Sequence, residues 1–124
     1  MSGLGADAGV SHNTARAWLS MLEASFIVMR VPRWHRNLRK RAVKAPKLHF
    51  IDSGLACHLL GIRTPEQLRL HPLRGALFES WVVAEVAKAR LHSGRPLDLY
   101  HMREDRGAEI DLVAESGQTV TASK

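Results

Sequence analysis

The sequence has a single cysteine, Cys57, among its 124 residues. One thiol excludes an intramolecular disulfide and a cysteine zinc cluster, and it fits the reducing cytoplasm, where we expect the protein to reside. No apolar run approaches the roughly 18 residues that a membrane span needs. No basic segment leads into an apolar core at Met1, so we expect neither a secretory signal nor a membrane partner.

Several catalytic signatures are also missing from the chain. No Gly-Lys-Ser/Thr follows the early glycines, and no phosphate loop occurs elsewhere, so the chain has no recognisable ATP site. The seven histidines show no His-Glu-x-x-His or other zinc spacing. No Gly-x-Ser-x-Gly elbow is present, and nothing indicates nucleophilic catalysis.

The positive charge is concentrated in one stretch. The net charge is +6, with 18 Lys/Arg and 12 Asp/Glu, and residues 30–47 contain eight Lys/Arg and no acidic residue. Residues 1–29 and 48–124 are each close to neutral. A basic block of this density is typical of proteins that bind polyanions, nucleic acid first. The alternative is a solvated loop that keeps the protein soluble.

A helix is predicted after Ser11, which is a good N-cap residue. Apolar side chains follow at helical spacing, from Ala15 through Leu19 to Leu22, and polar ones fall on the other face. The turn before it and residues 12–24 resemble the second half of a helix-turn-helix, in which His12, Asn13 and Arg16 would approach DNA. An ordinary amphipathic helix is the alternative.

Two strands are predicted on either side of the basic stretch, over residues 26–31 and 47–51. Helix, strand, basic loop and strand is the order of a winged helix, with the loop as the wing. Contacts between such a wing and phosphates give affinity and salt dependence without sequence choice. The wing residues expected to contact phosphate are Arg36, Arg39, Lys40, Arg41 and Lys44.

The middle of the chain is predicted to contain two helices and a linker. Asp52 caps a short helix over residues 55–60, and residues 63–67 are interpreted as a linker. Residues 74–91 form the strongest helix, with apolar residues on most sides, which predicts that it is covered on more than one side. Glu79 lies on its apolar face and needs a partner, a metal or a proton. A structural ion pair is the alternative to a site role.

Strands are predicted over residues 97–102 and 108–113, and a third begins at residue 119 after a turn at 115–118. Glu109 and Asp111 are two residues apart and so share one face of their strand. Together with Glu79, they suggest a site for a hard divalent cation such as Mg²⁺. A solvated strand face is the alternative.

Several separated segments resemble one known prokaryotic arrangement. They are VSHNT (10–14), LSMLEASF (19–26), KAPKLHFIDSGL (44–55), LRGALFESWVVAE (73–85) and GAEIDLV (107–113). In this order they resemble the C-terminal region of bacterial and archaeal AAA+ superfamily ATPases that end in a domain of unknown function. The similarity extends over residues 8–122. It implies an ATPase module ahead of a winged helix and a restriction-endonuclease-like domain.

The resemblance implies an α/β (α+β) fold with two regions. Residues 10–62 are a winged-helix domain, and residues 73–124 a nuclease-like domain truncated at its C-terminal strand. Residues 1–9 are predicted to be a flexible N-terminus because they are mostly small. In a PD-(D/E)xK core, Glu79 and Asp111 match the metal-binding carboxylates, which makes them candidate catalytic and Mg²⁺-binding residues. The Glu-x-Lys of the next strand is missing, because the chain stops at Ser123-Lys124.

We therefore interpret the chain as a fragment or truncated product of such an ATPase, binding double-stranded DNA without catalysis of its own. One alternative is a Mg²⁺-dependent nuclease that uses Glu79 and Asp111. The other is an interaction module that contacts the missing ATPase half or forms a homo-oligomer through the unfinished edge of its sheet.

Overall fold

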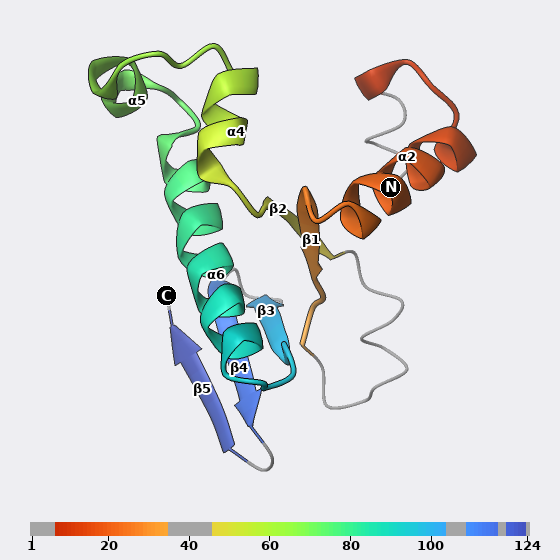
Figure 1. Cartoon of the computed structure of the whole chain (residues 1–124), viewed down its shortest axis with the longest axis vertical. Helices are drawn as coiled ribbons and strands as arrows, with labels where there is room; N and C mark the ends of the chain where they lie inside the picture. Colours follow the sequence, from red (N-terminus) through yellow and green to blue (C-terminus); the bar gives the residue numbers. More distant parts are fainter. Residues whose placement is uncertain (1–6, 35–45, 104–108, 117–118, 124) are drawn as a thin grey trace.

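The computed structural model of the chain describes residues 7–34, 46–103, 109–116 and 119–123. Helices and two small antiparallel sheets combine in it, which confirms the α+β class (Figure 1). None of the helices that it describes is long and apolar enough to span a membrane. The elements are α2 (His12–Ala24), β1 (Val28–Val31), β2 (Lys47–Phe50), α4 (Ser53–Leu59), α5 (Pro65–Leu70), α6 (Arg74–His92), β3 (Leu99–Arg103), β4 (Glu109–Ser116) and β5 (Thr119–Ser123).

Helix α2 begins at the cap that the sequence predicts. The hydroxyl oxygen of Ser11 accepts a hydrogen bond from the Thr14 N–H at 3.2 Å, which satisfies one of the unpaired donors of the first turn. Beyond the C-terminal end, Phe26 has a φ of 60°, in the left-handed region that non-glycine residues rarely adopt. This turn moves the start of β1 to Val28, two residues later than predicted.

Strands β1 and β2 pair antiparallel, with Val28 opposite Phe50 and Val31 opposite Lys47. The two strands predicted around the basic stretch are thus confirmed as neighbours. The chain after β1 also pairs in parallel with β3: the Trp34 N–H donates to the His101 carbonyl at 2.7 Å, and the His101 N–H donates to the Pro32 carbonyl at 3.0 Å. The backbone therefore connects the hairpin to the C-terminal sheet.

Helix α4 is capped by Asp52 as predicted, since the Asp52 carboxylate accepts from the Gly54 N–H at 2.8 Å. The linker predicted over residues 63–67 is wrong, because α5 begins there at Pro65. The Thr64 hydroxyl oxygen accepts from the Gln67 N–H, and the Gln67 side chain accepts from the Arg63 N–H. Proline is well suited to the first helical position, so these residues start a helix and do not interrupt one.

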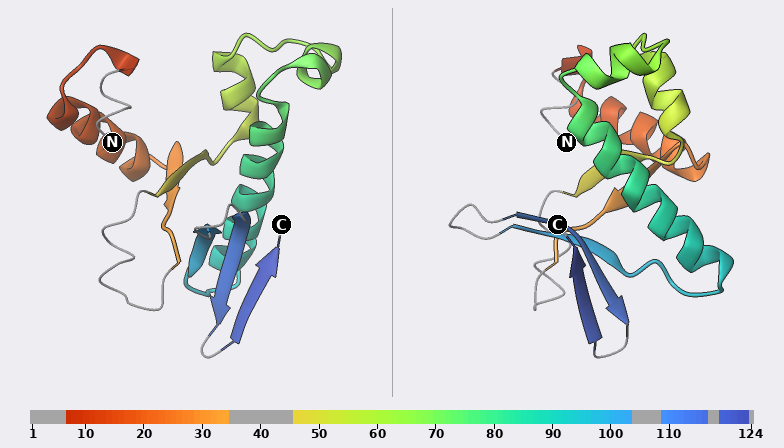
Figure 2. Two further views of the ribbon diagram at one scale, coloured as in Figure 1. Left: turned by 180° about the vertical axis from the view of Figure 1, so that it is seen from behind. Right: turned by 90° about the vertical axis from the view of Figure 1, so that its left-hand side faces the viewer.

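The hydrophobic core joins the early and late parts of the chain. Its buried cluster takes residues from β1, α6, β3 and β4: Met29, Val31, Val83, Ala87, Leu99 and Leu112. Figure 2 shows α6 lying against the C-terminal sheet, with β1 and β2 beside it. The expectation that α6 is covered on more than one side is met in part: the helix contacts β2, α4 and α5, but Phe78 and Trp81 are 64% and 50% exposed. The buried residues of α6 are Val83, Ala84 and Ala87.

The C-terminal sheet has the order β3-β4-β5, with both pairs antiparallel. Between β3 and β4 the register shifts: Tyr100 lies opposite Val113, whereas Met102 lies opposite Ile110. Two steps along β3 thus match three along β4, so β4 carries an extra residue near Asp111. This irregularity interrupts the alternation predicted for the strand, and the adjacent residues Leu112 and Val113 are both buried.

Candidate functional site

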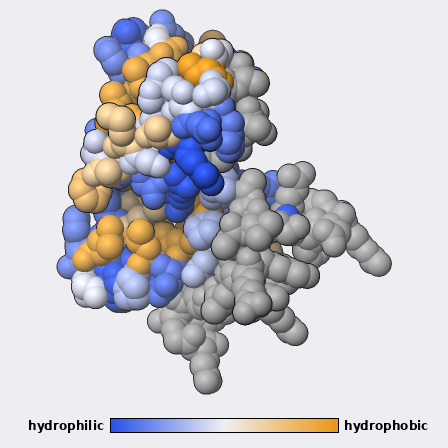
Figure 3. All heavy atoms as spheres, turned by 90° about the vertical axis from the view of Figure 1, so that its right-hand side faces the viewer, coloured by the Kyte–Doolittle hydropathy of each residue, from blue (hydrophilic) through white to orange (hydrophobic). Residues whose placement is uncertain are grey.

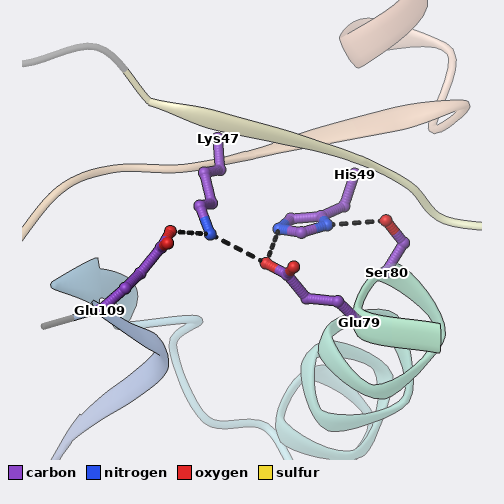
Figure 4. A network of polar contacts seen from close by, with 5 residues as sticks. All are labelled: Lys47, His49, Glu79, Ser80 and Glu109. Carbon is purple, nitrogen blue, oxygen red and sulfur yellow. Dashed lines mark hydrogen bonds and ion pairs between the residues drawn. The ribbon is translucent and has the colours of Figure 1, made fainter. Parts of the chain in front are cut away.

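A network of polar side chains connects three elements near the start of β2. The Lys47 Nζ atom lies 2.5 Å from a carboxylate oxygen of Glu109 in β4 and 3.1 Å from one of Glu79 in α6. Figure 4 shows the lysine pointing between the two carboxylates. The partner that Glu79 needs on its apolar face is therefore a lysine 32 residues earlier in the chain.

The two carboxylates keep Lys47 charged. Burial by itself would lower the pKa of the Lys47 ammonium, but hydrogen bonds and charge interactions with Glu109 and Glu79 outweigh it and raise the pKa above its ordinary value. Both glutamates remain partly exposed, as does the lysine. Solvent therefore screens the attraction, and the group acts as a link between β2, α6 and β4 of moderate strength.

His49 extends the network along the same face of β2. Its side chain is 4% exposed, and its Nδ1 atom lies 2.8 Å from the Ser80 hydroxyl oxygen. Its Nε2 atom lies 3.9 Å from Glu79 Oε1, which is beyond hydrogen-bond range and within reach of an ion pair when the ring is protonated. Glu79 and Ser80, adjacent in α6, thus both face β2 (Figure 4).

The predicted metal-binding pair is only partly described. Glu79 is in the network, while Asp111 lies in β4 with its side chain outside the described residues. Within the parts of the chain that the structure covers, no group of three or more His, Cys, Asp or Glu side chains is arranged to hold a metal ion. The cation that contacts Glu79 here is the Lys47 ammonium.

No sequence motif singles out Lys47 and His49 as site residues. In the sequence, Lys47 stands out only as the last charge of the basic stretch. The available signal is their spacing: residues two apart share one face of a strand, so a lysine and a histidine stand together on β2. Their partners on α6 and β4 come from distant parts of the sequence, which no local pattern indicates.

The predicted DNA contacts fall into two groups. His12, Asn13 and Arg16 are exposed on α2. The wing residues Arg36, Arg39, Lys40, Arg41 and Lys44 all lie outside the described residues.

The two ends of the basic stretch are paired with acidic residues. The Arg30 guanidinium lies 2.5 Å from the Glu23 carboxylate, and this ion pair ties β1 to α2. At the other end, Lys47 contacts Glu79 and Glu109. The first and last cations of the stretch therefore have structural partners, and the candidates for binding a polyanion are the residues between them.

These features define an α+β protein in which the hairpin that follows α2 shares one core with α6 and the C-terminal sheet. Residues 1–66 match the family described as "Domain of unknown function (DUF8612)", and the chain belongs to this family. Residues 74–123 match "Domain of unknown function (DUF4143)".

The chain is similar to two curated mycobacterial proteins. One is an uncharacterized protein of Mycobacterium bovis and the other an uncharacterized protein of Mycobacterium tuberculosis. Each is 34% identical over 106 residues, which cover 86% of this chain and 23% of the relative. The chain thus spans about a quarter of the length of these relatives. No solved structure matches it.

Proposed function

We propose that the chain is a DNA-binding module from the C-terminal region of a prokaryotic AAA+ ATPase-like protein, without catalysis of its own. The observation that carries this proposal is the pairing of β1 with β2, with Val31 opposite Lys47. It makes the stretch rich in Lys and Arg a connection between two neighbouring antiparallel strands, as the wing of a winged helix is. The match of residues 74–123 to a domain of unknown function agrees with the resemblance to such ATPases.

The position of α2 supports the same proposal. Its N-terminal residues His12, Asn13 and Arg16 are exposed, and the Arg30–Glu23 ion pair fixes the end of the helix to β1. A helix held beside a hairpin in this way has its polar face available for a groove of DNA. Cations in the segment that follows β1 would then meet the phosphates and supply affinity that is independent of sequence.

A binding experiment tests this proposal directly. Fluorescence anisotropy with a labelled duplex of about 20 base pairs should give an affinity that falls steeply between about 50 and 200 mM salt. The triple variant R39E/K40E/R41E should abolish binding while its circular dichroism spectrum stays unchanged. The matched control R63E/K88E/R95E makes the same change in net charge outside the basic stretch and should retain most of the affinity. No binding at low salt, or equal losses in both variants, would refute the proposal.

The second candidate function is a Mg²⁺-dependent nuclease that uses Glu79 and Asp111. The contact of Lys47 with both Glu79 and Glu109 favours it, because it brings the Glu79 carboxylate close to β4, the strand that carries Asp111. Cleavage of plasmid DNA with Mg²⁺, lost in Asp111→Ala, would support this function. If calorimetry detects no Mg²⁺ binding, the nuclease function is refuted for this chain.

A further inference from the structure

Helices α4, α5 and the first half of α6 line a cavity of about 370 Å³ that is open to solvent. These helices lie on the side of the molecule away from α2 (Figure 1). Its walls are almost entirely apolar and include Leu68 of α5 and Leu77, Phe78 and Trp81 of α6. Cys57 of α4 also lines it. Cavities that hold small molecules in proteins start at about 300 Å³ and are lined mostly by apolar and aromatic side chains, with a few polar groups.

The aromatic side chains of this cavity are left open to solvent. The Phe78 and Trp81 rings are neighbours, with centroids 6.0 Å apart and planes inclined by 31°, yet more than half of Phe78 and half of Trp81 remain exposed. Covering them with an apolar guest would remove this surface from water, which is favourable in proportion to the area buried. The cavity therefore favours a ligand with an apolar body.

The charged residues that line the cavity are both positive. Arg69 Nη2 lies 3.0 Å from the Glu66 carboxylate, and Arg74 Nη1 donates to the Arg69 carbonyl at 2.9 Å. Each contact holds a guanidinium in place and uses only one of its five N–H donors. Because the wall itself is almost entirely apolar, the two guanidinium groups can meet a ligand only at the edge of the cavity, where they are suited to a carboxylate or another small anion.

We propose that this cavity binds a small molecule with an apolar body and one anionic group, such as a medium-chain or aromatic carboxylate. The apolar body lies against Phe78 and Trp81, and the anionic group meets Arg69 and Arg74. The proposal does not depend on DNA binding, since none of these residues belongs to α2, to the hairpin or to the basic stretch.

Cys57 makes the test specific, because it is the only cysteine of the chain and lies in the cavity wall. The rate at which a maleimide labels it is measured in the whole chain with decanoate, with 1-decanol as the uncharged control and with decyltrimethylammonium as the cationic control, all below their aggregation limits. Decanoate should slow labelling in a saturable way, and the two controls should do so far less. Labelling that is unchanged by decanoate, or slowed as strongly by decanol, would overturn the proposal.

Variants then locate the anionic group. The double variant R69Q/R74Q should weaken the protection by decanoate about tenfold or more, because a charge-assisted pair is lost. R95Q, the same substitution at a single exposed arginine beyond the end of α6, should leave it unchanged. Leu68→Trp fills the cavity and should abolish protection, with the thermal unfolding curve as the check of folding. Protection by decanoate that survives R69Q/R74Q, or that is lost equally in R95Q, would show that the arginines do not hold the anion.

Discussion

Helices α2 and α6 have 13 and 19 residues, and both carry tryptophan on an apolar face, but the fold covers them differently. In α2 only Ala15 and Leu19 are buried, and its main neighbour is β1. Trp18 remains 52% exposed, and apolar side chains reach the surface in patches among hydrophilic ones on the side where α2 lies (Figure 3). In contrast, α6 packs on β2, α4 and α5 and buries Val83 in the core.

This difference in burial suggests that α6 contributes mainly to stability and α2 mainly to binding. The core cluster draws on β1, α6, β3 and β4 and on no residue of α2, so removing contacts of α6 disturbs both ends of the chain. Helix α2 is attached through the turn at Phe26 and the Arg30–Glu23 ion pair. Changes on its exposed faces should therefore alter what the protein binds more than whether it folds.

The largest effect is expected from a charge in the core face of α6. Val83 is 1% exposed, and Val83→Asp would bury a carboxylate without a matched partner, at a cost of at least about 4 kcal/mol. Small domains have only about 5–15 kcal/mol of stability in total. Urea unfolding followed by circular dichroism should show a largely unfolded variant. Trp18→Asp on α2 is the control and should cost less, about 2–3 kcal/mol, because about half of the Trp18 side chain is buried. Equal losses of unfolding free energy in the two variants would show that α2 belongs to the same core as α6.

A smaller loss is expected when the link between α6 and the two sheets is cut. Lys47→Met leaves the Glu79 and Glu109 carboxylates near each other without their shared cation, and should lower the free energy of unfolding by about 1–2 kcal/mol, since all three groups are partly exposed. Adding Glu79→Gln should restore part of this loss, because the two changes share one interaction. A double-variant cycle in urea measures the coupling. If the changes in unfolding free energy of the two single variants simply add in the double variant, the Lys47–Glu79 ion pair contributes nothing to stability.

The pH dependence of the same variant follows from the raised pKa of Lys47. When the pKa of a lysine is higher in the folded protein than in the unfolded chain, its ion pair stabilises the fold fully at any pH below the pKa of the unfolded chain. This stabilisation is lost as the pH rises through the pKa of the folded protein. Because the ordinary value is 10.5 and the folded value lies above it, the difference between the wild type and Lys47→Met should be constant from about pH 6 to 9. A difference that disappears within this range would contradict the assignment of the ion pair.

Binding should respond to α2 and not to α6. Arg16→Glu on the exposed face of α2 should weaken duplex binding about tenfold and lower the slope of log affinity against log salt by about one. The stability should hardly change, because Arg16 is exposed. Lys88→Glu in α6 changes the net charge equally and should leave affinity and slope nearly unaffected. If both variants weaken binding alike, the interaction is a general effect of net charge and α2 has no special part in it.

Local sequence signals predict most of the elements but not their partners. The cap at Ser11, the strands beside the basic stretch and helix α6 all follow from capping residues and periodicity. The need of Glu79 for a partner also follows from its position on an apolar face. That the partner is Lys47 does not, because the contact depends on how β2 packs on α6. Helix α5 is missed because Pro65 is interpreted as an interruption where it occupies the first position of a helix.

The smallest effect concerns the turn that joins α2 to β1. Phe26 has a left-handed backbone, which disfavours a residue with a Cβ atom by about 1–2 kcal/mol, and glycine is the usual residue at this position after a helix. The side chain is 79% exposed, so Phe26→Gly gives up little burial, and the net gain should be about 0.5–1 kcal/mol. Met21→Gly, inside α2, is the matched control and should lose about 1 kcal/mol. Urea unfolding of both variants separates the two cases. A loss in Phe26→Gly comparable to that of the control would show that the exposed ring contributes to stability and that the strain at this turn is offset by its contacts.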